Sequence, residues 1–313
     1  MTSSNDSRPT TLVIGATGRH GRTGAKVVEQ LLAHEHHVRV LARSTGEHTD
    51  LLVRQGAQVL VGDLLDRRTL GEVVDGVDAV YFTYPIAAGA LPAAANLASV
   101  LRAAQLAPRF VVMSMGPSMA DSPSALGRAQ WMAEEVLSWA GLAPVVLRVG
   151  ALFYENIPLL HGSSIRATGT FANNFGSGRA PWISGQDAAD LAVAALLDPD
   201  RYPAGTISYP GGVELRSHAE IADMIAAEIG SPVEYAYISQ AEWQAELEAR
   251  SDTGVINPAM AQHISAVAER FAASGGAAPT RQSDPQAVAD AIGHAPLSFA
   301  EFIRASRDDF ARR

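Results

Sequence analysis

Short apolar runs alternate with stretches of helical spacing over the first half of the chain. The apolar runs predict buried β-strands at 11–14, 37–42, 58–61, 79–83, 109–113 and 144–149. Apolar residues at helical spacing follow residue 21, and longer helices are predicted over 91–104 and 124–140. Strands that alternate with helices imply a parallel sheet with right-handed crossovers. The pattern therefore predicts an α/β fold built on a doubly wound parallel sheet.

The pattern is looser in the second half of the chain. Residues 162–178 are rich in Gly, Ser, Thr and Asn, and we expect them to form an irregular loop over a binding cleft. The Gly, Ala, Pro and Ser of 274–285 predict a flexible connecting segment. Helix starts are predicted at three Ser-x-x-Glu capping boxes, which begin at Ser217, Ser239 and Ser298.

The first predicted strand runs directly into Gly15-Ala16-Thr17-Gly18-Arg19-His20-Gly21, and a helix follows. Gly15 permits a tight turn, Gly18 lets the backbone approach a ligand, and Gly21 allows helix and strand to pack closely. The N-terminus of the helix then presents N–H groups and the positive end of its dipole. A strand, clustered glycines and a helix in this order predict a diphosphate-binding loop of the Rossmann type.

The residue after the second strand bears on the choice of dinucleotide. An NAD-binding domain usually has an acidic residue there for the ribose hydroxyls, about 20 residues past the glycines. This chain has Arg43 and Ser44 instead. A guanidinium fits the 2′-phosphate of NADP(H), so that NADP(H) is favoured over NAD(H); the alternative is a solvated surface arginine.

These observations predict how the chain is organised. We expect an NADP-binding Rossmann domain over 10–150 and a smaller C-terminal α/β substrate lobe over 151–313. Segments at about 180–200 are expected to return and complete the Rossmann core.

Composition excludes several classes of function. The net charge of −9 argues against nucleic acid or an anionic membrane as a partner, and no apolar run approaches the ~20 residues of a membrane span. The chain has no cysteine, which excludes disulfides and thiolate catalysis, and we expect no metal site. The polar segment 1–9 lacks the apolar core of a signal peptide, so we expect a cytoplasmic location. We also expect a monomer or homodimer and a small-molecule substrate.

The lysine content excludes one mechanism. Classical short-chain dehydrogenases use a Tyr-x-x-x-Lys pair, in which the ammonium group lowers the pKa of the tyrosine. Lys26 is the single lysine of the chain, and no tyrosine stands four residues before it. A Tyr-Lys pair is therefore excluded.

The chain resembles a known family. The Gly-Ala-Thr-Gly-x-x-Gly loop is similar to that of atypical short-chain dehydrogenases, and the segment 147–156 (LRVGALFYEN) resembles the "LRP-x-x-F-x-E-N" segment of NmrA-like NAD(P)-binding proteins. The resemblance covers nearly the whole chain. Together with the glycine loop, it implies an NADP site formed by Gly15, Thr17, Gly18, Arg19, His20, Gly21, Arg43, Asp63, Leu64, Thr83, Tyr84 and Asn156.

The resemblance also indicates where catalysis would occur. Reductases of the family often have a lysine four residues before the glutamate that corresponds to Glu134, and this chain has Gln130 there. Glutamine can hydrogen-bond a ribose but can neither carry a charge nor act as a proton donor or acceptor in catalysis at neutral pH. Ser114 ends the fifth strand, where short-chain dehydrogenases place a serine that holds the substrate oxygen. Ser114, Gln130 and Tyr154 are the candidate catalytic residues, and packing or positioning is the alternative role of each.

Three functions are compatible with these patterns. The first is an NADPH-dependent reductase of a small, mostly apolar acceptor such as a quinone, an enone, an imine or a secondary-metabolite intermediate. The second is a non-catalytic NADP(H) sensor that binds a regulatory protein, since the family contains such proteins. The third, an epimerase or dehydratase of nucleotide sugars, is disfavoured by the missing Tyr-Lys pair. We favour the reductase.

Overall fold

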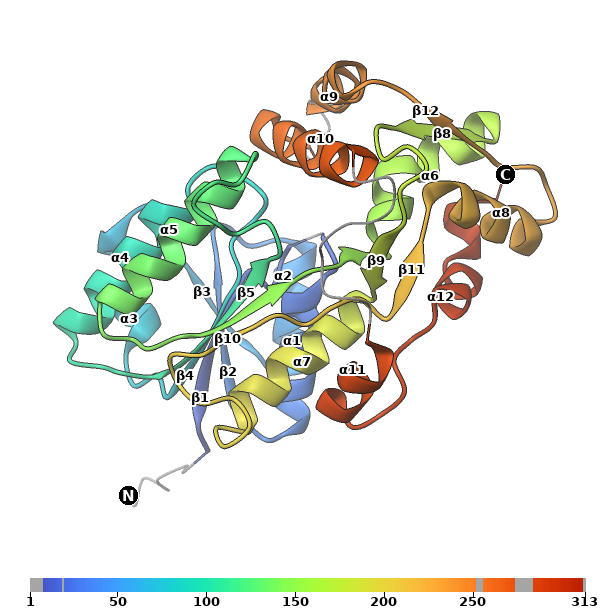
Figure 1. The fold of residues 1–313 in the computed structure, drawn as a ribbon. Coiled ribbons are helices and arrows are strands. Elements are labelled where there is room, and N and C mark those ends of the chain that lie inside the picture. The colour runs from blue at the N-terminus through green and yellow to red at the C-terminus, as the bar shows by residue number, and fades with distance from the viewer. Residues whose placement is uncertain (1–7, 19, 252–255, 274–283, 312–313) are drawn as a thin grey trace.

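The computed structural model describes residues 8–18, 20–251, 256–273 and 284–311. Its centre is a seven-stranded sheet with the order β10-β6-β5-β4-β1-β2-β3, in which every pairing is parallel (Figure 1). The strands are β1 (Thr10–Ile14), β2 (His37–Ala42), β3 (Gln58–Val61), β4 (Ala79–Phe82), β5 (Arg109–Met115), β6 (Val145–Val149) and β10 (Ile207–Ser208). This order is that of a Rossmann sheet and confirms the predicted fold class.

Helices cover both faces of the sheet, which explains why its strands are continuous apolar runs. Side chains alternate along each strand, so Val13 and Tyr81 pack towards one face while Leu12 and Val80 pack towards the other. The first face is covered by α1 (Thr23–Ala33) and α7 (Gly185–Leu197), with α2 (Glu47–Gln55) beside α1. The second face is covered by α3 (Gly71–Val74), α4 (Ala90–Ala103) and α5 (Ala125–Trp139), and η1 (Arg67–Thr69) lies beside α3.

The second half of the chain adds two smaller sheets and six further helices among the described residues. One sheet has the order β11-β9-β7, and the other joins β8 to β12 in parallel. The strands are β7 (Leu152–Phe153), β8 (Thr170–Asn173), β9 (Ala180–Ile183), β11 (Glu214–Arg216) and β12 (Glu234–Tyr237). The helices are α6 (Asn156–Thr168), α8 (His218–Ile229), α9 (Gln240–Glu248), α10 (Pro258–Ala273), α11 (Pro285–Ile292) and α12 (Phe299–Ala305), followed by η3 (Arg307–Asp309).

All three predicted capping boxes are confirmed. In each, the serine hydroxyl accepts a hydrogen bond from the N3 backbone N–H, and the glutamate carboxylate accepts one from the serine N–H. They begin α8, α9 and α12. Residues 274–283 of the predicted connecting segment lie outside the described residues.

The loop predicted over 162–178 is wrong for most of its length, because α6 continues to Thr168 and β8 follows it. Gly162 lies inside α6, where a Cβ would come within 3.1 Å of the Asp309 carbonyl oxygen, so this glycine marks close packing rather than a loop. Gly169, with φ of 74°, ends the helix. β8 then gains its hydrogen bonds from β12, a partner remote in the sequence.

Two elements return from the second half to the Rossmann sheet. α7 packs on the face that also carries α1, and β10 pairs with β6 as the seventh strand. Arg109 at the start of β5 donates to the carbonyls of Ala195 and Tyr202, which ties the end of α7 to the sheet. By contrast, β9 belongs to one of the smaller sheets.

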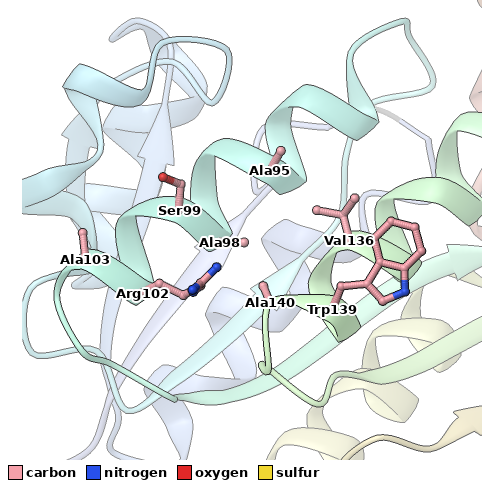
Figure 2. A pocket seen from close by; sticks show the side chains of 8 residues that line it. All are labelled: Ala95, Ala98, Ser99, Arg102, Ala103, Val136, Trp139 and Ala140. Carbon is pink, nitrogen blue, oxygen red and sulfur yellow. The ribbon is translucent and has the colours of Figure 1, made fainter.

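The outer surface of α4 and α5 has a shallow groove of about 510 Å³ (Figure 2). Small side chains form most of its walls, and Trp139 stands at its edge with 70% of its surface exposed. The groove lies on the helical layer rather than at the strand ends where ligands of such sheets bind. Within the described ranges, no helix is long and apolar enough to cross a lipid bilayer.

Candidate functional site

The glycine loop is packed tightly against β4 and α1. Gly15 has φ of 85°, and a Cβ there would lie 2.7 Å from the carbonyl oxygen of Thr83, just after β4. A Cβ on Gly24, in the first turn of α1, would lie 2.5 Å from the Gly15 carbonyl oxygen. Real Cβ atoms do not approach oxygen this closely, so both positions require glycine. These two glycines shape the loop.

Gly18 and the start of α1 have a different character. Gly18 is exposed, and a Cβ there would meet only the Gly15 carbonyl oxygen, at 3.1 Å, among the described residues. Arg22, the N-cap of α1, provides no side-chain hydrogen bond, and the first turn contains no acidic residue. The N-terminal N–H groups of α1 therefore keep their capacity to bind an anion, and this fits the diphosphate of a dinucleotide.

The other predicted cofactor residues lie along the same edge of the sheet. Arg43 follows β2, Asp63 and Leu64 follow β3, and Thr83 and Tyr84 follow β4. β2 and β4 flank β1, and β3 lies beyond β2. Burial and the charge of Asp63 raise the pKa of the Tyr84 hydroxyl, whereas Arg43 lowers it, so these three side chains are within electrostatic reach of one another. Arg43 itself is exposed. Arg19 lies outside the described residues.

The glycine loop also meets the start of α6. His20 Nδ1 lies 3.1 Å from Asn156 Oδ1, which joins two segments that are 136 residues apart. Burial lowers the pKa of His20, although the bond to Asn156 opposes that shift, so the imidazole is neutral near pH 7. The structure thus brings Asn156 to the predicted loop.

A pocket of about 560 Å³ lies along the same carboxyl edge, in the half of the sheet that contains β5, β6 and β10. Residues at or just after the ends of β5, β6 and β10 line it, together with residues of α10. Its lining is mainly apolar: Gly116, Pro117, Met119, Arg148, Val149, Gly150, Ala151, Leu152, Tyr209, Pro210, Gly211, Val267, Arg270 and Phe271. Its size and polarity are those of a site for a small organic molecule.

Two glycines form part of the pocket surface without side chains. A Cβ on Gly116 would lie 3.0 Å from the Cα of Gly150, so the two backbones are in contact. Among the residues that the structure describes, a Cβ on Gly150 would meet only the Pro210 carbonyl oxygen, at 3.7 Å. This surface can accommodate a flat ring against the backbone.

An ionic network centred on the buried Glu134 joins the ends of β5 and β6. The Glu134 side chain, on α5, is 3% exposed. Its Oε2 accepts hydrogen bonds from Arg148 Nε at 2.9 Å and Nη2 at 2.6 Å, and its Oε1 accepts from Ser118 Oγ at 2.7 Å and from Ser114 Oγ. Arg148 Nη1 donates to the Tyr209 hydroxyl at 3.1 Å. Burial lowers the pKa of Arg148, but its interactions with Glu134 and Tyr209 outweigh that effect and raise the pKa above its usual value.

The three predicted catalytic residues do not line this pocket. Ser114 has one hydroxyl hydrogen and donates it to Glu134, so it cannot donate to a substrate oxygen at the same time. Gln130 is buried on α5, one turn before Glu134, rather than on the helix surface.

The structure favours packing, the alternative role of Tyr154. Its side chain is fully buried, its ring packs against Phe299 and Phe302 of α12, and its hydroxyl donates to the Leu297 carbonyl at 3.2 Å. Burial and nearby carboxylates, first Glu214, raise the pKa of this phenol far above its usual value. Tyr154 is a core residue that anchors the C-terminal helix.

Sequence reasoning missed Glu134, Arg148 and Arg270 as parts of the site. A charged Arg148 inside the apolar run 144–149 and a glutamate on the buried face of α5 were usable indications of an ion pair. Arg270 had no such indication, because its place in the pocket depends on the tertiary packing of α10.

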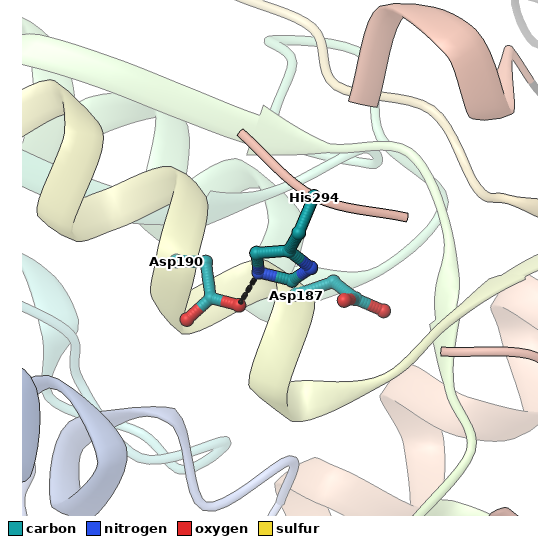
Figure 3. A group of neighbouring side chains, drawn as sticks. All are labelled: Asp187, Asp190 and His294. Carbon is teal, nitrogen blue, oxygen red and sulfur yellow. Dashed lines mark hydrogen bonds and ion pairs between the residues drawn. The ribbon is translucent and has the colours of Figure 1, made fainter. Parts of the chain in front are cut away.

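One group of possible metal ligands lies elsewhere, where α7 meets the segment after α11 (Figure 3). His294 Nε2 lies 3.0 Å from Asp190 Oδ2, and its Nδ1 lies 2.9 Å from the Ala295 carbonyl oxygen. Asp187 accepts hydrogen bonds from Ser184 and from the Leu297 backbone. These contacts join α7 to the C-terminal segment, and hydrogen bonds already occupy both imidazole nitrogens.

Comparison with known proteins agrees with this geometry. Residues 15–199 match the NAD(P)H-binding family. The chain is 32% identical to an NAD(P)H azoreductase of Xenophilus azovorans over 232 residues, which are 73% of this chain and 77% of that one. Its fold is similar to that of the NADPH-dependent quinone oxidoreductase QOR2 of Escherichia coli in complex with NADPH (TM-score 0.78, 20% identity, covering 95% and 99% of the two chains). NmrA has the same fold (TM-score 0.71, 16% identity, 97% of each chain). The chain therefore belongs to the NAD(P)H-binding family and is an NAD(P)H-dependent oxidoreductase.

Proposed function

We propose that this chain reduces a small, mostly apolar acceptor, such as a quinone, an enone, an imine or an azo compound, at the expense of NADPH. The observation that carries the proposal is the apolar pocket at the ends of β5, β6 and β10, next to the dinucleotide edge of the same sheet. The names of the azoreductase relative and of the quinone oxidoreductase with the same fold support it.

Separate groups of this chain would hold the two halves of the cofactor. Gly18 and the N-terminus of α1 would bind the diphosphate, and Arg43 would bind the 2′-phosphate and favour NADPH over NADH. The backbone surface of Gly116 and Gly150 would leave room for the flat nicotinamide ring. When bound, NADPH supplies the hydride.

The residues around the pocket position the reactants rather than supply a catalytic proton. Glu134 fixes Arg148 and Ser114, and thereby the ends of β5 and β6. The single lysine, Lys26 of α1, forms an ion pair with Glu155 at 3.2 Å. Acceptors that take the hydride first and a proton from water afterwards fit this arrangement, and quinones are one such class.

The test is oxidation of NADPH, followed by absorbance, with a panel of quinones, enones, imines and azo compounds. The variant Gly150→Leu should lower kcat/KM at least tenfold, because its side chain would enter the pocket without a backbone clash. The matched control is Gly71→Leu, since a Cβ at that exposed position meets no atom of the described residues within 4 Å. Tight NADPH binding without turnover of any acceptor would contradict the proposal and favour the NADP(H) sensor.

A further inference from the structure

The charges around the pocket are not balanced. Arg148 and Arg270 both line it, and among the residues that the structure describes no aspartate or glutamate does. Glu134 neutralises Arg148 through two hydrogen bonds. Arg270 therefore gives the pocket one net positive charge, in a chain whose net charge is −9.

The surroundings of Arg270 do not neutralise it. Its Nη1 lies 3.9 Å from Met119 Sδ, and a thioether is a weak acceptor without charge. The neighbouring Glu269 is directed elsewhere, with Oε2 accepting from Asn174 Nδ2 at 3.2 Å. Over the described ranges, none of the ion pairs includes Arg270.

The pocket therefore differs between its two sides. The strand-end side has the backbone surface of Gly116 and Gly150. The α10 wall has the apolar Val267 and Phe271 next to the cationic Arg270. A guanidinium matches the planar, two-oxygen geometry of a carboxylate and also pairs with a sulfonate. An apolar body with an anionic end complements this pocket.

We propose that the acceptor carries a carboxylate or sulfonate remote from the atom that is reduced, and that Arg270 pairs with this group. The inference rests on the proposed reductase function and narrows its substrate class to aromatic compounds with an apolar body and one anionic group. Arg270 is then a specificity-determining residue. Because its side chain is exposed, the pair contributes a modest affinity that salt screens.

The test uses two acceptors with the same azobenzene skeleton: one has a para-carboxylate, and the other is its uncharged methyl ester. Each is titrated calorimetrically into the protein saturated with NADP⁺, where no turnover occurs. We expect the carboxylate to bind about tenfold more tightly than the ester at low salt. Arg270→Ala should bring this ratio to about one, and Arg270→Lys should restore part of it. The control Arg102→Ala, which removes the same charge from α4, should leave the ratio as in the wild type.

Equal binding of the two compounds to the wild type would overturn the inference, and so would a ratio that persists in Arg270→Ala. Oxidation of NADPH with the same two compounds separates this failure from failure of the reductase function. Preferential binding of the carboxylate without NADPH oxidation would support the assignment of Arg270 and contradict the reductase. Oxidation with both compounds at equal kcat/KM would support the reductase and contradict the role of Arg270.

Discussion

The two halves of the carboxyl edge of the sheet differ in whether backbone or side chains form the candidate site. At β1 to β4 the candidate dinucleotide site consists mainly of backbone: glycines without room for a Cβ, and the uncapped start of α1. At β5, β6 and β10 most of the pocket is formed by side chains, among them Arg148, which Glu134 holds, and those of α10; the backbone of Gly116 and Gly150 forms the rest of the strand-end side. The half at β1 to β4, called the backbone half below, suits the constant diphosphate of a cofactor. The half at β5, β6 and β10, called the side-chain half, can vary with the acceptor.

This difference also separates what local sequence encodes from what tertiary packing decides. The glycine loop is a continuous segment, so the strand, the glycines and the helix could be predicted together. The pocket joins Gly116, Gly150 and Arg270, which lie in distant parts of the chain. The sequence pattern does not show which helix covers the pocket.

The largest expected effect concerns the side-chain half and its stability. Glu134→Ala would leave the partly buried Arg148 without its partner and remove the acceptor of Ser114 and Ser118. Breaking such a buried pair should lower the free energy of unfolding by about 3–5 kcal/mol. Urea denaturation measures this change.

Glu135→Ala is the matched control, because it removes the neighbouring, less buried acid of the same helix. We expect that variant to lose less than about 1 kcal/mol. Similar losses for the two variants would show that the Glu134 network contributes little.

The next effect concerns the backbone half and its one predicted cationic contact. Loss of a charge-assisted bond to the 2′-phosphate costs about 1.5–3 kcal/mol, so Arg43→Ala should weaken NADPH binding at least tenfold. NADH binding should hardly change, because NADH has no 2′-phosphate. Calorimetric titration with both cofactors measures the two affinities.

Arg54→Ala, at an exposed position in the last turn of α2, controls for the loss of one positive charge. It should leave both affinities unchanged. If Arg43→Ala weakens NADPH and NADH equally, then Arg43 does not select the 2′-phosphate.

The smallest effect is expected at Lys26, which lies on α1 beside the backbone half. Lys26→Arg preserves the charge opposite Glu155, so the free energy of unfolding should change by less than about 1 kcal/mol and most turnover should remain. Thermal melting and NADPH oxidation measure the two quantities. Complete loss of turnover with unchanged melting would mean that the lysine has a catalytic role.

The strands and the capped helices could be predicted because their patterns are local. All six predicted strands occur. α5 begins at Ala125, one residue after its predicted start, because Ser124 is its N-cap. The loop predicted over 162–178 was wrong because composition does not reveal that β8 finds a partner in β12. Tyr154 was misplaced for a similar reason: the Tyr154 ring is buried because α12, which is remote in the sequence, packs against it.

The candidate catalytic residues illustrate the same limit. Ser114 was predicted from its position at the end of a strand, but its role depends on whether its hydroxyl is already engaged. Glu134 engages it from a helix that packs across the strand. The identity of a strand-end residue thus predicts its location better than its chemistry.

The central claim is that NADPH bound at the backbone half reduces an acceptor bound at the side-chain half. The most direct test is a single turnover with NADPH deuterated at the nicotinamide carbon that delivers the hydride, followed by mass spectrometry of the reduced acceptor. An enone is suited to this test, because its reduction forms a C–H bond that keeps the label. We predict that the deuterium appears in the product of the wild type and that Gly150→Leu slows its transfer at least tenfold. Oxidation of NADPH without deuterium in the product, or transfer at the wild-type rate in Gly150→Leu, would contradict the claim.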